Sequence, residues 1–188
     1  MSGGGLRSLS VFSEMGFQLI LLLGIGVFGG IQADSDCNES SENIARKGVA
    51  TQSSLMASGV PKFAIDGNQN GNYHEYSCTH TSHDNRPWWQ LDLQESKKIA
   101  AVVVANRIDC CSTRLTGAEI RVGNSPDLNN PLCGKITDVS QGSVFKLCCG
   151  GMEGRYVTVV IPDRTEYLTL CEVEVYPAME NGNENSCL

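Results

Sequence analysis

The chain has 188 residues, of which 21 are acidic and 14 are basic, giving a formal net charge of -7. This acidity argues against nucleic acid or an anionic membrane surface as the main partner, because both attract proteins through a basic patch. Hydrophobic residues make up 41% of the chain, which excludes an intrinsically disordered protein. Nine cysteines are more than a routine cytosolic domain carries. Because no Cys-x-x-Cys pair occurs, disulfides are favoured over a zinc site.

The first 33 residues have the pattern of a secretory signal peptide. Arg7 precedes an apolar run over residues 16–31, and Ala33 offers a small-residue cleavage point. A membrane anchor is the alternative, but the run is Gly-rich and shorter than the roughly 18 to 20 residues that a span requires. We therefore predict that residues 1–33 are removed, and that the chain from residue 34 is extracellular and does not insert into a membrane.

The remaining chain divides into a polar lead-in over 34–42, one domain over 43–177 and a polar tail over 178–188. The lead-in contains Asn38-Glu39-Ser40, an acceptor sequence for N-glycosylation at Asn38.

The domain has the periodicity of β-strands. Apolar and polar residues alternate over 89–93, 155–159 and 168–176, which is typical of strands with one buried face. Residues 99–105 form a continuous apolar run, which favours a strand buried on both faces. Gly, Pro and Asn turns separate these segments, and no long helical pattern occurs. We therefore predict an all-β domain, an antiparallel β-sandwich or jelly roll.

Polar groups gather between residues 64 and 114. Residues 64–72 form a loop rich in oxygen atoms that suit a hard cation, although a turn-rich surface loop has the same composition. His80 is either a ligand contact or a hydrogen-bonded structural residue. Trp88 and Trp89 begin an alternating strand, which favours a place in the core over a sugar-stacking platform.

Arg107 and Arg114 follow the apolar run, with Asp109 between them. Asp109 can orient a guanidinium so that its fork of donors points at hydroxyl oxygens, although an exposed ion pair is the simpler reading. Cys110 and Cys111 are adjacent. Their Cα atoms are about 3.8 Å apart across a trans peptide, which is shorter than the range that disulfides prefer. A bond between them is therefore strained, and it forms a rigid, flat, apolar patch.

The order and spacing of His80, Arg107, Asp109 and Arg114 resemble the signature of the F-type lectins, the fucose-binding lectins typified by fish fucolectins. The resemblance covers residues 43–177. It includes the stretches Asn43-Ile44-Ala45, Cys78-Thr79-His80, Pro87-Trp88-Trp89, Gly154-Arg155-Tyr156-Val157 and Leu170-Cys171-Glu172-Val173-Glu174-Val175.

The resemblance implies a jelly-roll β-sandwich similar to discoidin domains, with one site for L-fucose. In that site His80, Arg107 and Arg114 are the implied hydrogen-bonding groups to the sugar. The Cys110–Cys111 disulfide is implied to pack against an apolar face of the sugar, and Tyr73 or His74 to flank its methyl group. His74 departs from the aromatic pair that some relatives carry, which leaves this wall less well defined.

A structural calcium ion is also implied by the resemblance. The implied ligands are the backbone carbonyls of Phe63 and Cys171 and the side chains of Asp66, Asn68, Ser77 and Glu172. The two carboxylates are expected to dominate the affinity because they neutralise the charge of the ion.

Two further disulfides are implied by the resemblance, Cys78–Cys171 and Cys133–Cys149, with Cys148 as an alternative partner for Cys133. Three cysteines then lie outside the framework. A Cys37–Cys187 link between the termini leaves Cys148 free, whereas a link through Cys187 to a second subunit is the other option.

These features together predict a secreted, calcium-containing lectin for fucosylated glycans, acting in cell agglutination or innate recognition. Because one shallow site binds weakly, a homo-oligomer is expected to supply avidity. The alternative is a discoidin-type adhesive module for a protein or lipid head group. An enzyme is not expected, because glycosidases require two carboxylates facing one sugar.

Overall fold

The computed structural model describes residues 37–137 and 139–179. The predicted signal peptide, residues 1–33, lies outside the described residues. So does the tail from residue 180 onward, which includes Cys187.

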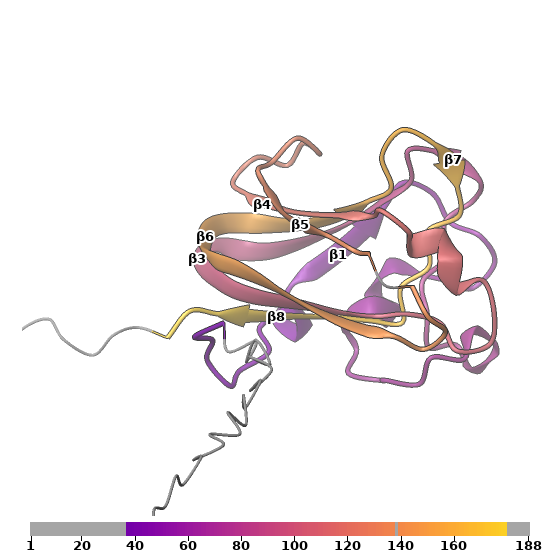
Figure 1. The fold of residues 1–188 in the computed structure, drawn as a ribbon, viewed down its shortest axis with the longest axis horizontal. Helices are drawn as coiled ribbons and strands as arrows, with labels where there is room; N and C mark the ends of the chain where they lie inside the picture. Colours follow the sequence, from indigo (N-terminus) through magenta and orange to yellow (C-terminus); the bar gives the residue numbers. More distant parts are fainter. Residues whose placement is uncertain (1–36, 138, 180–188) are drawn as a thin grey trace, which may run out of the picture. The chain divides into compact units, whose positions relative to one another are not determined.

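Two long antiparallel strands, β3 (Trp88–Ala105) and β6 (Val144–Val160), form the centre of the domain. Their pairing shifts in register between Asp92 and Lys97, and the parts before and after the shift have different neighbours. The first part of β3 pairs with β1 (Val49–Gln52), and the second part pairs with β8 (Glu172–Pro177). The end of β6 pairs with β4 (Glu119–Gly123), which also pairs with β5 (Leu132–Lys135). Figure 1 shows the long strands bending from the layer that ends in β5 to the layer that contains β8. The predicted all-β sandwich is confirmed.

The core lies between the layers and consists mainly of the inward-facing side chains of the strands, together with buried residues of the loops. Its large, fully buried members include Trp89, Leu91, Ile99, Ile120, Leu168 and Leu170. Trp89 donates its Nε1–H to the carbonyl of Pro61 at 2.9 Å, which satisfies the one polar group of this buried ring. Trp88 is only partly buried.

Two of the predicted strand boundaries are wrong. The segments 89–93 and 99–105 belong to one strand, because β3 continues through the bend. The alternating segment 168–176 is a strand only from Glu172 onward. In its first part the backbone bonds to threonines instead, since the N–H groups of Leu168 and Leu170 donate to the Oγ1 atoms of Thr81 and Thr79 at 2.9 and 3.1 Å. The alternation over the first part of this segment therefore comes from the burial of every second side chain, and not from pairing with a neighbouring strand.

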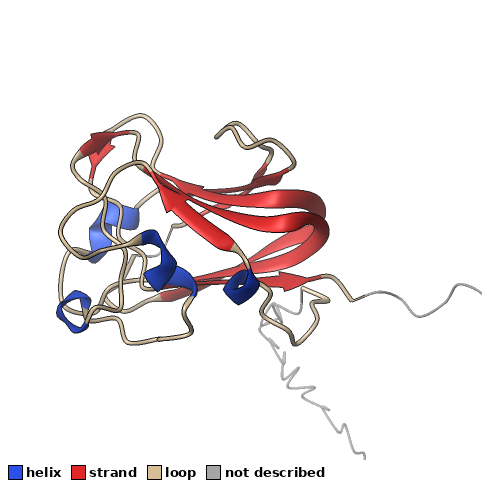
Figure 2. Ribbon diagram, turned by 180° about the vertical axis from the view of Figure 1, so that it is seen from behind, coloured by secondary structure: helices blue, strands red, loops and turns tan. Residues whose placement is uncertain are grey.

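Short 3-10 helices and a small sheet form the loops. The helices are η1 (Ala45–Lys47), η2 (Pro61–Ile65), η3 (Tyr73–Glu75) and η4 (Ser112–Leu115). The small sheet pairs β2 (Asp84–Asn85) with β7 (Thr165–Glu166). In Figures 1 and 2 the small sheet and most of the helices lie at one end of the sandwich, opposite the end where the long strands bend.

Four disulfides hold the described chain together. Cys78–Cys171, Cys110–Cys111 and Cys133–Cys149 are the pairs that the resemblance implies, and the fourth joins Cys37 to Cys148. Of the two alternatives for the remaining cysteines, the Cys37–Cys187 link with a free Cys148 is therefore wrong. Successive residues of a strand point to opposite faces, so buried Cys149 reaches Cys133 while exposed Cys148 faces outward. The lead-in passes close by because it bonds to β8, as in the 2.8 Å bond from the Ser40 N–H to the Pro177 carbonyl.

Candidate carbohydrate-binding site

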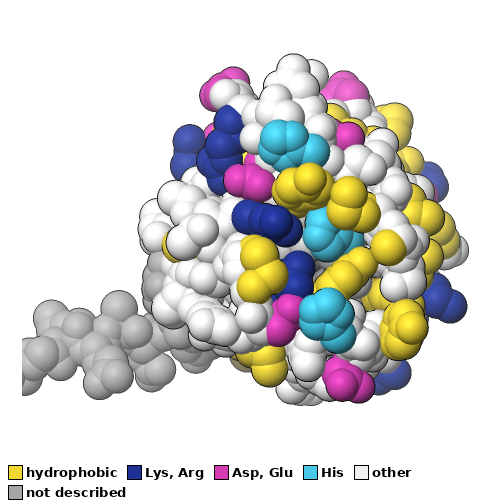
Figure 3. Space-filling model, turned by 90° about the vertical axis from the view of Figure 1, so that its right-hand side faces the viewer, with side chains coloured by type: hydrophobic (Ala, Val, Ile, Leu, Met, Phe, Trp, Pro, Cys, Tyr) yellow, Lys and Arg dark blue, Asp and Glu magenta, His cyan; other side chains and the backbone are white. Residues whose placement is uncertain are grey.

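The loops at one end of the sandwich bring the predicted site residues together. Arg107 follows the end of β3, Arg114 lies in η4, and Tyr73 lies in η3. His80 lies in the loop that Cys78 fixes to Cys171. Figure 3 looks onto this face and shows histidine, basic and acidic side chains interleaved with hydrophobic ones.

His80 is at the centre of the site and is only 6% exposed. Its Nδ1 lies 2.7 Å from the carbonyl oxygen of Thr81, a partner that can only accept, so Nδ1 carries the proton. Nε2 lies 3.5 Å from Nη1 of Arg114 and is the acceptor of that contact. Burial lowers the pKa of His80, and the charges of Arg114 and Arg107 lower it further, although the Thr81 bond opposes them. The imidazole is therefore neutral at pH 7, with one acceptor facing the arginine.

Arg107 is held by Asp109 and Tyr73. Its Nε donates to Oδ1 of Asp109 at 3.0 Å, and its Nη2 donates to Oδ2. This bidentate pair uses two of the five N–H donors of the guanidinium. The whole Arg107 side chain is only 4% exposed. The Arg107 bonds hold the pKa of Asp109 down at about 2, helped by the backbone N–H of Tyr73. The Tyr73 ring lies against the guanidinium, with 4.8 Å between Cζ and the ring centroid.

Arg114 has a second set of partners, which the sequence did not indicate. Its Cζ lies 4.6 Å from the ring centroid of Tyr167, and its Nε lies 3.7 Å from Oε1 of Glu166. Its backbone carbonyl accepts a 2.7 Å bond from Nη2 of Arg164. These three residues come from the segment around β7, fifty or more positions further along the chain. The stretch Arg164-Thr165-Glu166-Tyr167 has no periodicity or motif that marks it as part of the site.

The Cys110–Cys111 disulfide lies in the turn between the two arginines, and its Cα atoms are 3.8 Å apart. Cys111 has a positive φ of 62°, an uncommon conformation for a residue with a side chain. Both cysteines are partly exposed, so the bonded sulfurs are available as an apolar surface. The turn is fixed by Asn106, whose Nδ2 donates to the Ser112 carbonyl at 3.1 Å.

Tyr73 and His74 differ in their relation to the centre. The Tyr73 ring is half-buried and meets His80 edge-on, with 5.1 Å between centroids. His74 is exposed, and its Nε2 lies 3.9 Å from Oδ2 of Asp109. Tyr73 is therefore part of the packed site, whereas His74 belongs to its rim.

The implied calcium ligands come from three stretches of the chain: η2 and the loop after it, the residues that follow η3, and the junction where Cys171 leads into β8. Asp66 and Asn68 are exposed, and Ser77 is buried. The loop is shaped by side-chain oxygens of Asp66, Asn68 and Asn70, each of which accepts the backbone N–H two residues later. The described residues hold no group of three or more His, Cys, Asp or Glu side chains placed for a metal. The implied set does not require one, because its other members are carbonyl, amide and hydroxyl oxygens.

Glu172 provides the test of whether a cation fits. Its side chain is buried, yet its Oε2 finds no hydrogen-bond partner among the described residues, and Oε1 accepts only the N–H of Gly67 at 3.2 Å. Burial, and then the nearby Asp66 carboxylate, raise the pKa of Glu172 to about 7. A buried carboxylate with an unpaired oxygen beside a second carboxylate is costly without a cation. The residues therefore fit a calcium ion.

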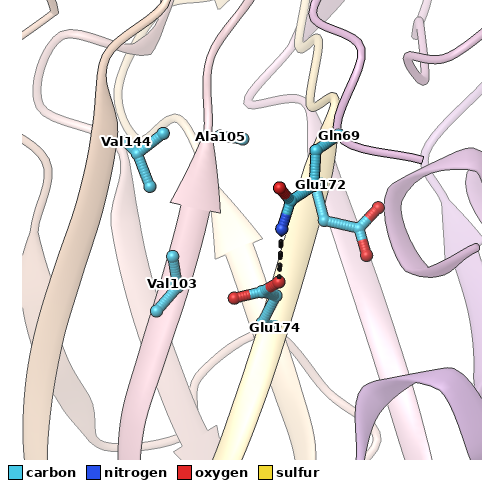
Figure 4. Close-up of a pocket in the computed structure, with 6 residues that line it drawn as sticks. All are labelled: Gln69, Val103, Ala105, Val144, Glu172 and Glu174. Carbon is cyan, nitrogen blue, oxygen red and sulfur yellow. Dashed lines mark hydrogen bonds between the residues drawn. The ribbon is translucent and has the colours of Figure 1, made fainter. Parts of the chain in front are cut away.

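Figure 4 shows Glu172 beside a pocket on the outer side of β3 and β8, with its carboxylate pointing away from the apolar wall of Val103 and Ala105. Across this pocket, Nε2 of Gln69 donates to Oε1 of Glu174 at 3.1 Å and so ties the loop to β8.

Comparison with known proteins identifies the family. A family model described as a NedA-like, galactose-binding domain matches residues 63–159. The chain is 40% identical to fucolectin-5 of Anguilla japonica over 183 residues, covering 90% of this chain and 96% of that protein. The chain belongs to the fucolectin family. It is also 43% identical over 155 residues to a pentraxin fusion protein of Xenopus laevis, covering 79% of this chain but only 37% of that longer protein.

Solved structures agree with this assignment. A fucolectin from striped bass serum matches with a TM-score of 0.72 and 50% identity, over 75% of this chain and 49% of the bass chain. A fucose binding module from Streptococcus pneumoniae matches with a TM-score of 0.66 and 30% identity, over 73% of this chain and 99% of that one. The chain thus spans about half of the bass protein and the whole of the bacterial module. It is a lectin domain and not an enzyme. Within the described residues, no helix is long and apolar enough to cross a membrane.

Proposed function

We propose that this protein binds L-fucose, alone and at the ends of fucosylated glycans, at the site around His80. The observation that carries the proposal is a neutral imidazole, His80, that contacts Arg114 and lies close enough to Arg107 to be affected by its charge, with a disulfide in the turn between the two arginines. Fucose has the matching chemistry, because its hydroxyl oxygens accept hydrogen bonds while its methyl group and one ring face are apolar.

Each residue has a distinct part in this recognition. The remaining N–H donors of Arg107 and Arg114 bind hydroxyl and ring oxygens, and Nε2 of His80 accepts a hydroxyl proton. The Cys110–Cys111 surface packs against the apolar face of the sugar, and Tyr73 closes the side near Arg107. Because the protein groups are already held by one another, little side-chain entropy is lost on binding.

A calcium ion completes the proposal. Its ligands are the carboxylates of Asp66 and Glu172 together with the oxygens of Phe63, Asn68, Ser77 and Cys171. The ion supplies positive charge that neutralises the two carboxylates. Through the loop that leads from Asn68 to Tyr73, it steadies one wall of the sugar site.

Secretion and avidity belong to the same proposal. Residues 1–33 direct the chain out of the cell, and Asn38, which is exposed, carries an N-linked glycan. A homo-oligomer presents several weak sites at once and agglutinates fucosylated cells or tags microbes. Enzymatic removal of N-glycans from the secreted protein is expected to lower its mass, and Asn38→Gln is expected to abolish that change.

A glycan array tests the central claim. Fucosylated glycans are expected to bind and their matched unfucosylated forms are not. Arg107→Ala is expected to remove binding, whereas Arg155→Ala, which breaks a similar bidentate pair with Asp92 elsewhere on the sheet, is expected to retain it. Equal signals from both glycan sets, or full binding by Arg107→Ala, would overturn the proposal. Binding that free fucose does not inhibit would instead indicate a protein or lipid ligand.

A further inference from the structure

The two arginines of the site have similar surroundings. Each guanidinium lies against a tyrosine ring, Arg107 against Tyr73 and Arg114 against Tyr167. Each also has a carboxylate partner. The His80 ring meets both tyrosines edge-on, with centroids 5.1 Å from Tyr73 and 5.4 Å from Tyr167.

The two arrangements differ in how firmly the carboxylate holds the arginine. Arg107 is 4% exposed and forms a bidentate pair. Arg114 is 22% exposed, and its contact with Glu166 is a single one of 3.7 Å, longer than a hydrogen bond. An ion pair of that length and exposure does little to restrict a long side chain. Apart from the long 3.5 Å contact between its Nη1 and Nε2 of His80, the side chain of Arg114 is therefore supported mainly by the face of the Tyr167 ring.

We infer that Tyr167 is the positioning residue of Arg114, so that its ring, and not an ion pair, sets the affinity of this half of the site for sugar. The inference rests on the proposed fucose site and extends it to a residue from a distant segment. A ring face attracts a guanidinium and also limits it to a plane, which aims the N–H donors toward His80 and the sugar.

The fold holds the Tyr167 ring in place. Glu166 pairs with Asp84 in the β2–β7 sheet, and the Tyr167 N–H donates to Oε1 of Glu166 at 2.9 Å. On the other side, the Leu168 N–H donates to Oγ1 of Thr81, the residue next to His80. Exposed His83 packs against the same ring, with 4.7 Å between centroids. The stretch that fixes His80 thus also fixes the ring under Arg114.

The chain contains a matched control. Arg155 lies 5.2 Å from the ring centroid of Tyr156 and has its own carboxylate partner, Asp92. These residues lie in paired strands β3 and β6, outside the site. Tyr156→Leu therefore removes the same kind of ring contact without touching the sugar.

The test measures binding of methyl α-L-fucoside by calorimetry, together with the NMR resonance of the Arg114 Nε–H group. Tyr167→Leu is expected to weaken binding about 5- to 20-fold, the range of a partly desolvated cation–π contact. Tyr167→Phe keeps the ring and is expected to stay within about twofold of the parent, as is Tyr156→Leu. The Arg114 resonance is expected to shift in Tyr167→Leu, because the ring current is lost, and to remain near its place in Tyr167→Phe.

Parental affinity in a folded Tyr167→Leu, or an unmoved Arg114 resonance, would overturn the inference. So would an equal loss in Tyr167→Phe, which assigns the effect to the hydroxyl. If Tyr167→Leu fails to fold, Tyr167→Phe decides instead. A loss of fucoside affinity in Tyr167→Phe as large as the loss in Arg114→Ala would overturn the inference. A loss seen only with a fucosylated trisaccharide, and not with the fucoside, would make Tyr167 a direct contact of the next sugar. If the parent itself fails to bind the fucoside, the proposed function fails, while the Arg114 resonance still decides whether Tyr167 positions the arginine.

Discussion

Asp109 is expected to contribute to stability and to binding through one interaction, its bidentate pair with Arg107. Replacing it by Asn keeps the shape and one acceptor but removes the charge, and leaves an arginine side chain that is 4% exposed without its counter-ion. The pair lowers the pKa of Asp109 from 3.8 to about 2. At about 1.4 kcal/mol for each pKa unit, this shift corresponds to about 2 kcal/mol of stability at pH 7.

For a domain of this size, Asp109→Asn is expected to lower the melting temperature by about 5 to 10 °C at pH 7. The folded-state pKa is the lower one, so the contribution is complete above about pH 4 and is lost as the pH falls toward 2. About half of it remains at pH 3. The difference in melting temperature between parent and variant should therefore narrow from pH 7 to pH 3. Fucoside affinity at pH 7 is expected to fall about tenfold, because the guanidinium is no longer oriented.

Calorimetric scans of the parent and Asp109→Asn at several pH values test this reasoning. Glu95→Gln serves as the control, since it breaks the exposed pair between Glu95 and Lys97 and should cost less than about 1 kcal/mol. Equal melting temperatures for the parent and Asp109→Asn at pH 7 would refute the assignment. A difference that does not change between pH 7 and pH 3 would show that the variant acts through packing and not through the charge.

Four further outcomes are expected for the sugar site, the calcium site and the disulfide of the lead-in. Since the pKa of His80 lies below its usual value, fucoside affinity is expected to be constant from pH 8 to 7 and to fall as the pH is lowered further, where a protonated Nε2 opposes Arg114; titration calorimetry from pH 8 to 5 checks it. Calcium removal by EDTA is expected to lower the melting temperature of the parent but not that of Glu172→Gln, as measured by scanning fluorimetry. Reduction of Cys37–Cys148, mimicked by the double Cys→Ser variant, is expected to cost up to about 4 kcal/mol in chemical unfolding while leaving sugar affinity unchanged. Affinity for the neutral sugar should vary less than twofold between about 50 and 500 mM salt, because each arginine already has a carboxylate beside it.

The fold class could be predicted from periodicity, and the boundaries could not. Alternation over 89–93 and the apolar run over 99–105 indicated strands correctly, but a sequence period does not show that β3 continues through a bend. Alternation also misled at Leu168 and Leu170, whose side chains are buried in the core while their backbone N–H groups bond to threonine hydroxyls of the loop around His80. A period of two shows only that every second side chain is buried, and a segment can meet that pattern without pairing as a strand.

The site was predictable in part for a similar reason. The arrangement of Arg107 and Asp109 is local, so its pairing follows from a separation of two residues. Tyr167 approaches Arg114 only because two-residue strands, β2 and β7, pair with each other, and so short a pairing leaves no sequence pattern. The Cys37–Cys148 bond likewise depends on the path of the lead-in along β8, and cysteine spacing alone does not fix connectivity.

At the proposed sugar site each arginine lies beside a carboxylate, so the site carries little net charge. An acidic protein that recognises a neutral sugar needs hydrogen-bond donors without a field that attracts polyanions. The fold achieves this by placing Asp109 next to Arg107 and Glu166 next to Arg114, with a neutral His80 between them. Because the charges are largely balanced within the site, selectivity arises from the directions of the N–H groups. Those directions depend on the tyrosine rings, so Tyr73 and Tyr167 are expected to act on recognition through the arginines that they contact.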